Sequence, residues 1–98
     1  MPNIQSSGSQ LVTADIAVGT SGVRTIVYAI HVLSGGGGAA APVLRNGTSG
    51  SGTIYIQETG TVSTGKSFEY GTQGFVFPGG CFCDVDANTT SVLVEYSQ

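Results

Sequence analysis

The sequence predicts an all-β protein: a single β-sandwich of jelly-roll or Ig-like type, with about seven to eight antiparallel strands and essentially no helix. Short runs rich in Val, Ile, Thr, Tyr and Phe are separated by turn signals drawn from 16 glycines, such as Asn46-Gly47 and Pro78-Gly79-Gly80. No segment carries a sustained 3.6-residue apolar period with helix caps. The 98 residues have the size of one domain.

The N-terminal part divides into an arm and a first strand. Residues 1–10 are polar and aperiodic, so we expect a flexible polar arm, with the β-sandwich domain spanning residues 11–98. From Gln10 to Val18 the side chains alternate in period two, with Val12, Ala14, Ile16 and Val18 on one face. This pattern predicts one half-buried strand.

Residues 23–33 predict the strongest strand, which is apolar on both faces and therefore central or covered on both sides. The remaining predicted strands are shorter and cover residues 43–45, 53–58, 67–70, 75–77, 81–87 and 91–96. We expect the last two to form a hairpin with a turn at Asn88-Thr89. That hairpin would place Cys81 and Cys83 on its apolar face, and Phe82, Asp84, Asp86, Leu93 and Glu95 on the other.

The chain carries few charges: three basic and six acidic residues, for a net charge of −3. Arg24, Arg45 and Lys66 lie far apart, so the cationic cluster that direct nucleic-acid binding needs is missing. No apolar run approaches the ~20 residues of a membrane span, and the N-terminus does not resemble a signal peptide. The sequence therefore predicts a protein made in a cytoplasm, with a Ser-, Thr- and Gly-rich surface suited to permanent contact with other proteins.

Cys81 and Cys83 are one residue apart, so in a strand their side chains run parallel on the same face. This spacing is close to the outer limit for a disulfide. We interpret them as two reduced, buried thiols that act as small hydrophobes, with a redox pair or a metal site as alternatives.

Residues 60–67, Gly-Thr-Val-Ser-Thr-Gly-Lys-Ser, match the P-loop pattern letter by letter. A phosphate-binding loop also needs a helix after the lysine, whose N-terminal amides hold the phosphate. The sequence after Lys66 is typical of strand and turn instead. Nucleotide binding is therefore not expected, and Lys66 is expected to end a solvent-exposed turn.

His31 is the only histidine, so a catalytic or metal-binding pair of histidines within one chain is excluded. We interpret it as a structural histidine, with a metal site shared between subunits as the alternative. Asp84, Asp86 and Glu95 could in principle bind Ca²⁺ or serve a glycosidase, but a solvated outer face is the simpler reading. We expect no enzyme activity and no cofactor.

Four segments resemble small structural proteins of tailed bacteriophages. They are Val27-Tyr-Ala-Ile-His-Val-Leu33-Ser-Gly-Gly36, Val43-Leu-Arg-Asn-Gly-Thr-Ser-Gly-Ser-Gly-Thr-Ile54, Phe77-Pro-Gly-Gly-Cys-Phe-Cys-Asp-Val-Asp86 and Val92-Leu-Val-Glu-Tyr96. The resemblance covers residues 20–98 as a pattern of strands and turns and carries no site motif. It implies a β-sandwich that decorates or cements a capsid, or that occurs in tail and fibre parts.

We therefore expect a capsid decoration (cement) protein located in the virion, which binds copies of itself, as a homotrimer, and the major capsid protein or other virion proteins. The candidate interface residues are Ile4 in the arm, His31 and Phe82. We expect the arm to lie along a neighbouring subunit. The alternative is a tail- or fibre-associated β-sandwich module that binds a glycan or a receptor.

Overall fold

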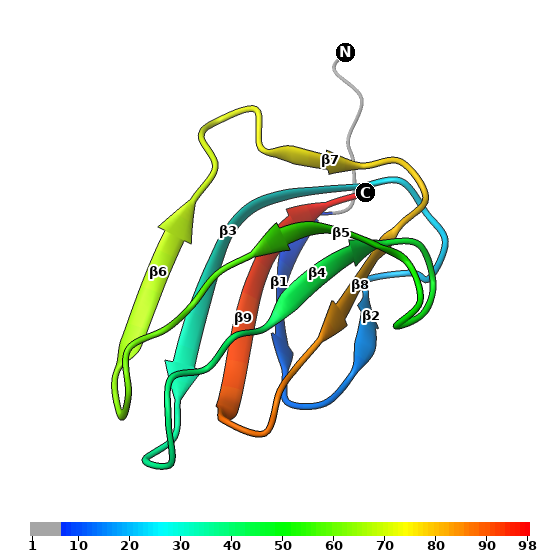
Figure 1. The fold of residues 1–98 in the computed structure, drawn as a ribbon. Helices are drawn as coiled ribbons and strands as arrows, with labels where there is room; N and C mark the ends of the chain where they lie inside the picture. Colours follow the sequence, from blue (N-terminus) through cyan, green and yellow to red (C-terminus); the bar gives the residue numbers. More distant parts are fainter. Residues whose placement is uncertain (1–6) are drawn as a thin grey trace.

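The computed structural model describes residues 7–98, and these form nine strands without a helix (Figure 1). The all-β prediction is confirmed. The strands are β1 (Ser7–Val12), β2 (Ile16–Val18), β3 (Thr25–Ser34), β4 (Val43–Asn46), β5 (Thr53–Gln57), β6 (Gly65–Glu69), β7 (Phe75–Phe77), β8 (Cys81–Asp84) and β9 (Thr89–Ser97).

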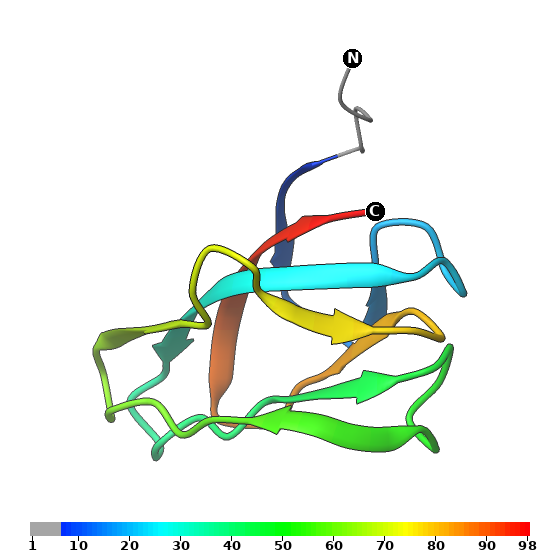
Figure 2. The same cartoon turned by 90° about the horizontal axis from the view of Figure 1, so that it is seen from above.

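The strands build two antiparallel sheets that pack face to face (Figure 2). Sheet A has the order β1-β9-β3-β6, with β7 also paired to β3, and sheet B has the order β2-β8-β4-β5. The strands pair as they would in one long hairpin whose turn lies between β4 and β5. Outward from that turn, β4 pairs with β5, β3 with β6 and β7, β2 with β8, and β1 with β9. Rolling that hairpin up adds the pairs β3–β9 and β4–β8. This is the strand arrangement of a jelly roll, which decides between the two sandwich types that the sequence left open.

The prediction of one strand from Gln10 to Val18 is wrong, because the chain passes from one sheet to the other within these residues. β1 belongs to sheet A and β2 to sheet B, and residues 13–15 make the bend between them. The Asp15 carboxylate fixes this corner by accepting a hydrogen bond from the backbone N–H of Val85 at 2.9 Å. Val12 and Val18 are buried, whereas Ile16 is half exposed. The period-two pattern holds only at its two ends.

The boundary of the N-terminal arm also moves. Residues 7–10, expected as part of the arm, form most of β1 and pair in an unbroken antiparallel register with β9. Residues 1–6, and with them Ile4, lie outside the described residues.

The predicted hairpin of the last two strands is wrong, because β8 lies in sheet B and β9 in sheet A. The short connection between them crosses from one sheet to the other, and Asp86 holds it by accepting hydrogen bonds from Thr89 Oγ1 and from the Ala41 N–H. The alternation of inward and outward residues still holds, because the inner face of each strand packs on the same core. Cys81, Cys83, Val92 and Val94 are all buried.

The core fills the space between the two sheets. Its fully buried members come from both layers and include Phe77, Ile30, Leu44, Val12, Val18, Val27, Val32, Val92 and Val94. β3 lies between β9 and the pair β6/β7, so its predicted central position is confirmed. Residues 7–98 contain no helix that is long and apolar enough to cross a membrane.

Candidate functional site

The three carboxylates that the sequence placed on one face are separated by the fold. Asp84 lies on β8 in sheet B, where its Oδ2 accepts a hydrogen bond from Arg45 Nε at 3.1 Å. Glu95 lies on β9 in sheet A. Asp86 lies in the connection between the sheets, where the hydrogen bond from Thr89 lowers the pKa of its carboxyl group. The common carboxylate face therefore does not exist.

Instead, the fold brings His31 together with Ser67 and Glu95 on the outer face of sheet A. His31 on β3 lies directly opposite Ser67 on β6 and opposite Leu93 on β9. Glu95 is two positions along β9 from Leu93, which makes it the diagonal neighbour of His31. His31 Nδ1 is 2.7 Å from Ser67 Oγ, and its Nε2 is hydrogen-bonded to the Glu95 carboxylate.

This cluster links a hydroxyl, an imidazole and a carboxylate in the order that nucleophilic hydrolases use. Two features separate it from such sites. The ring is reversed, since serine hydrolases direct Nε2 toward the serine and Nδ1 toward the acid. Ser67 also lies within a strand, not at the tight strand-to-helix turn that presents such a nucleophile. We call His31, Ser67 and Glu95 the polar clasp, because their hydrogen bonds link the three neighbouring strands β3, β6 and β9.

The prediction that His31 is a structural histidine agrees with these hydrogen bonds, but its partners were not predicted. Ser67 and Glu95 lie 36 and 64 residues further along the chain. Only the register of β6 and β9 against β3 identifies them. The side chains of His31 and Glu95 are 35 % and 49 % exposed, so the hydrogen bond between them contributes at most about 1 kcal/mol to stability.

Two shallow hollows flank this clasp. The first, of about 520 Å³, is lined by Gly8, Ser9, Tyr28, Leu93, Glu95 and Tyr96. The second, of about 380 Å³, is lined by Tyr28, Ala29, His31, Glu69, Gly71, Thr72 and Glu95. Tyr28 and Glu95 line both hollows. Tyr28 is the extra residue of a β-bulge where β3 pairs with β9, and its hydroxyl is hydrogen-bonded to Ser97 Oγ at 2.8 Å.

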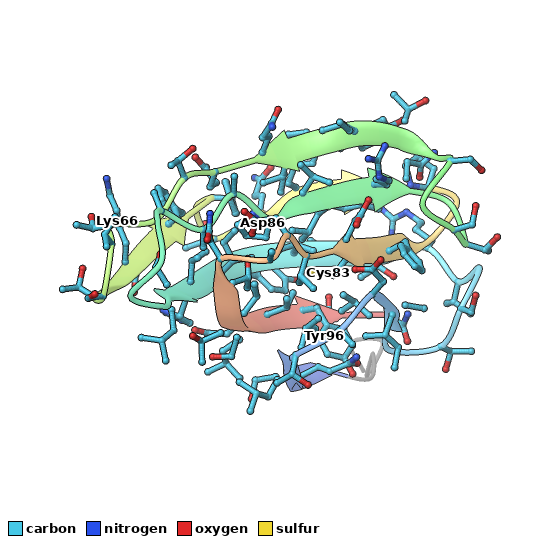
Figure 3. The ribbon with its side chains drawn as sticks, turned by 60° about the horizontal axis from the view of Figure 1, so that its bottom comes forward. Lys66, Cys83, Asp86 and Tyr96 are labelled. Atoms are coloured by element: carbon cyan, nitrogen blue, oxygen red, sulfur yellow. The ribbon has the colours of Figure 1, made fainter. Side chains whose placement is uncertain are left out.

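As expected from the sequence, the segment that matches the P-loop pattern, residues 60–67, has no helix after it. Residues 65–69 form β6, so the helix N-terminus that would hold a phosphate is missing. Lys66 is exposed, and its Nζ lies 5.4 Å from the centre of the Phe68 ring. Figure 3 shows it at one end of the molecule, away from Cys83 and Tyr96.

Both cysteines are buried and free, as the sequence predicted. Burial raises the pKa of Cys83 to about 12 and also raises the pKa of Cys81. Neutral thiols in such surroundings are poor nucleophiles and poor metal ligands. Within residues 7–98 no group of three or more His, Cys, Asp or Glu side chains could hold a metal ion.

The raised thiol pKa values predict that the protein loses stability at alkaline pH. In the unfolded chain the thiols ionise near pH 8.5, whereas in the folded protein they stay protonated. Stability is therefore complete below that pH and falls above it by about 1.4 kcal/mol per thiol per pH unit. Urea unfolding at pH 8 and pH 10 measures this loss. A variant with Cys81→Ala and Cys83→Ala should show a smaller loss, and an equal loss would contradict the prediction.

Several exposed apolar side chains lie on the edge strands β5 and β7. Ile54, Tyr55, Phe75 and Val76 are each between 36 % and 43 % exposed, and we call these four the β5–β7 patch. The rings of Tyr55 and Phe75 are 5.9 Å apart, which joins the two strands across the side of the sandwich. Phe82, the predicted interface residue, is half-buried on β8 and lies outside this patch.

Comparison with known proteins adds no relative. No family model matches the chain, and no match is found among curated proteins or among solved structures. The fold and the site together define a jelly-roll β-sandwich with a charge-poor surface, a polar clasp on one sheet face and an apolar patch on one edge.

Proposed function

We propose that this protein is a structural component of a tailed-phage virion, most simply a capsid decoration (cement) protein that stabilises the head through symmetric subunit contacts. The resemblance of residues 20–98 to such proteins suggested the class. The jelly-roll order of the strands supports it, because capsid proteins are among the proteins built on this fold.

The observation that carries the proposal is the β5–β7 patch. Tyr55 and Phe75, whose rings are in contact, place exposed apolar surface on neighbouring edges of the two sheets, and exposed apolar surface of this kind marks where a small soluble domain meets another protein. The charges beside β5 are also paired within the chain: Arg45 binds Asp84 and the Gly52 carbonyl, and Glu58 accepts a hydrogen bond from Tyr70 at 2.9 Å. The patch can therefore make apolar contacts without unpaired charges of Arg45 or Glu58 beside it.

Co-sedimentation with empty capsids that lack their decoration protein tests the proposal. We expect the protein to pellet with capsids at a fixed ratio, and Ile54→Asp to weaken this binding at least about tenfold because it buries a charge in the contact. Val62→Asp is the matched control, since Val62 is 45 % exposed but lies in the loop between β5 and β6. Absence of capsid binding, or equal loss in both variants, would contradict the proposal.

The same assay tests the arm. Because β1 begins at Ser7, deleting residues 1–6 removes Ile4 and leaves the strand in place. Capsid occupancy should fall in this deletion variant if the arm lies along a neighbouring subunit. Unchanged occupancy would remove the arm from the proposal.

A glycan- or receptor-binding tail module is the second candidate, and the two hollows on sheet A favour it. They bring hydroxyl, imidazole and carboxylate groups of Tyr28, His31, Glu69 and Glu95 to one open face. A glycan array followed by isothermal titration tests this candidate. Binding that is lost in Glu95→Gln but kept in Ile54→Asp would replace the capsid proposal.

A further inference from the structure

We propose that the outer edge of β1 pairs with β1 of a second copy, so that sheet A continues across a two-fold axis. This inference deepens the proposed function and rests on it, because it names a surface through which copies of a structural protein meet. It starts from the row of backbone N–H and C=O groups that every edge strand leaves without a partner strand.

Four of the five edge strands in the described structure carry features that discourage pairing. β6 contains Lys66 and Glu69, and charged side chains protect an edge. β2 and β7 have only three residues each. β5 has a bulge, since Leu44 pairs with Ile56 and Arg45 with Ile54, which leaves Tyr55 as the extra residue.

The edge of β2 is further covered by two glutamine side chains. Gln10 donates to the Ala17 carbonyl at 3.0 Å and accepts from the Gly19 N–H at 2.7 Å. Gln98 donates to the Val18 and Thr20 carbonyls at 3.2 and 3.0 Å. These side-chain amides take up backbone groups that a further strand of sheet B would otherwise bind.

β1 has none of these protections. Its six residues pair with β9 without a bulge, from Ser7 opposite Ser97 to Val12 opposite Val92. The strand contains no charge and no proline, and the first charged residue of the chain is Asp15. Leu11 is 61 % exposed, the largest exposure among the large apolar side chains described, and nothing lies within 4 Å of the Cβ position at Gly8.

A second copy is the partner that fits this edge. An antiparallel pair of identical strands is related by a two-fold axis, and a strand without a bulge keeps its inner and outer faces matched across that axis. A neutral strand also meets its own copy without repulsion. The contact makes a dimer the unit of assembly, in place of the homotrimer expected from the sequence analysis.

Light scattering over a range of concentrations tests this inference on the isolated protein. One strand pair is smaller than a standard interface of about 800 Å² per partner, so we expect a dissociation constant in the micromolar range or weaker. The mass should rise from 9.9 kDa toward twice that value as the concentration increases. Ser9→Lys and Leu11→Lys should each weaken association at least about tenfold.

Thr53→Lys is the matched control, because it places the same charge on the exposed first residue of the edge strand β5. Amide hydrogen exchange in the unmodified protein gives a second measurement, in which the β1 amides should exchange more slowly at high concentration. A monomer at all concentrations, a mass of three chains, or equal loss of association in Thr53→Lys would overturn the inference. Capsid co-sedimentation tests the proposed function separately. If the Ser9→Lys protein is monomeric but still pellets with capsids, the role of the β1 contact in assembly is contradicted and the proposed function is not.

Discussion

Replacing Phe77 with alanine is expected to lower the free energy of unfolding by about 3–5 kcal/mol. A domain of this size is stable by only about 5–15 kcal/mol, so the change removes a large share of the total. Phe77 is the largest fully buried side chain in the described structure. It lies on the short strand β7, where its ring centre is 5.3 Å from that of Tyr55 and 5.6 Å from that of Phe75.

The cost is expected to be high because the cavity cannot easily close. Phe77 pairs with Thr25 on β3, and its ring packs beside Tyr55 of the opposite sheet, so it joins sheet A to sheet B along one side. The neighbouring atoms belong to paired strands and can shift only a little. The cavity then adds its own cost to the lost burial of the ring.

Phe75→Ala is the matched control, since it removes the same side chain two residues away on the same strand. Phe75 is 38 % exposed, so its loss should cost clearly less than the loss of Phe77. Urea unfolding followed by circular dichroism measures both variants. Equal destabilisation by the two variants would show that burial at Phe77 is not what holds the sheets together.

The sequence predicted those elements of the fold that depend on local pattern. β3 was recognisable because ten residues in a row alternate with both faces largely apolar, and β7 because Phe75–Phe77 is bounded by Gly74 and Pro78. The inward direction of Cys81 and Cys83 was also predictable, since alternation along a strand does not depend on which strand lies next to it.

The assignment of strands to sheets was not predictable, because a period of two is the same in either sheet. The corner at Asp15 depends on a hydrogen bond to Val85, which is 70 residues away. The crossing between β8 and β9 has a length that suits a hairpin equally well. The partners of His31 follow from the register of three strands, and the sequence pattern does not encode that register.

Replacing Gly80 with alanine is the second change expected to have a large effect. Gly80 has a φ of +98°, a backbone conformation that costs an L residue about 1–2 kcal/mol. A Cβ atom at this position would also lie 2.9 Å from the Gly22 nitrogen and 3.0 Å from the Gly22 Cα. Because both contacts are to backbone, the loop at Gly22 or the turn before β8 must shift, which we expect to cost a further ~1–3 kcal/mol.

Gly71→Ala separates the two contributions. Gly71 also has a positive φ, of +83°, but nothing lies within 4 Å of its Cβ position. Alanine there should carry only the cost of backbone strain, so the difference in unfolding free energy between the two variants measures the contact with Gly22. The Gly80 turn is further fixed by hydrogen bonds from the Gly80 N–H to the Phe77 carbonyl and from the Gly47 N–H to the Gly80 carbonyl. If both variants lose the same stability, the close contact between Gly80 and Gly22 contributes nothing, and the positive φ alone accounts for the preference for glycine at position 80.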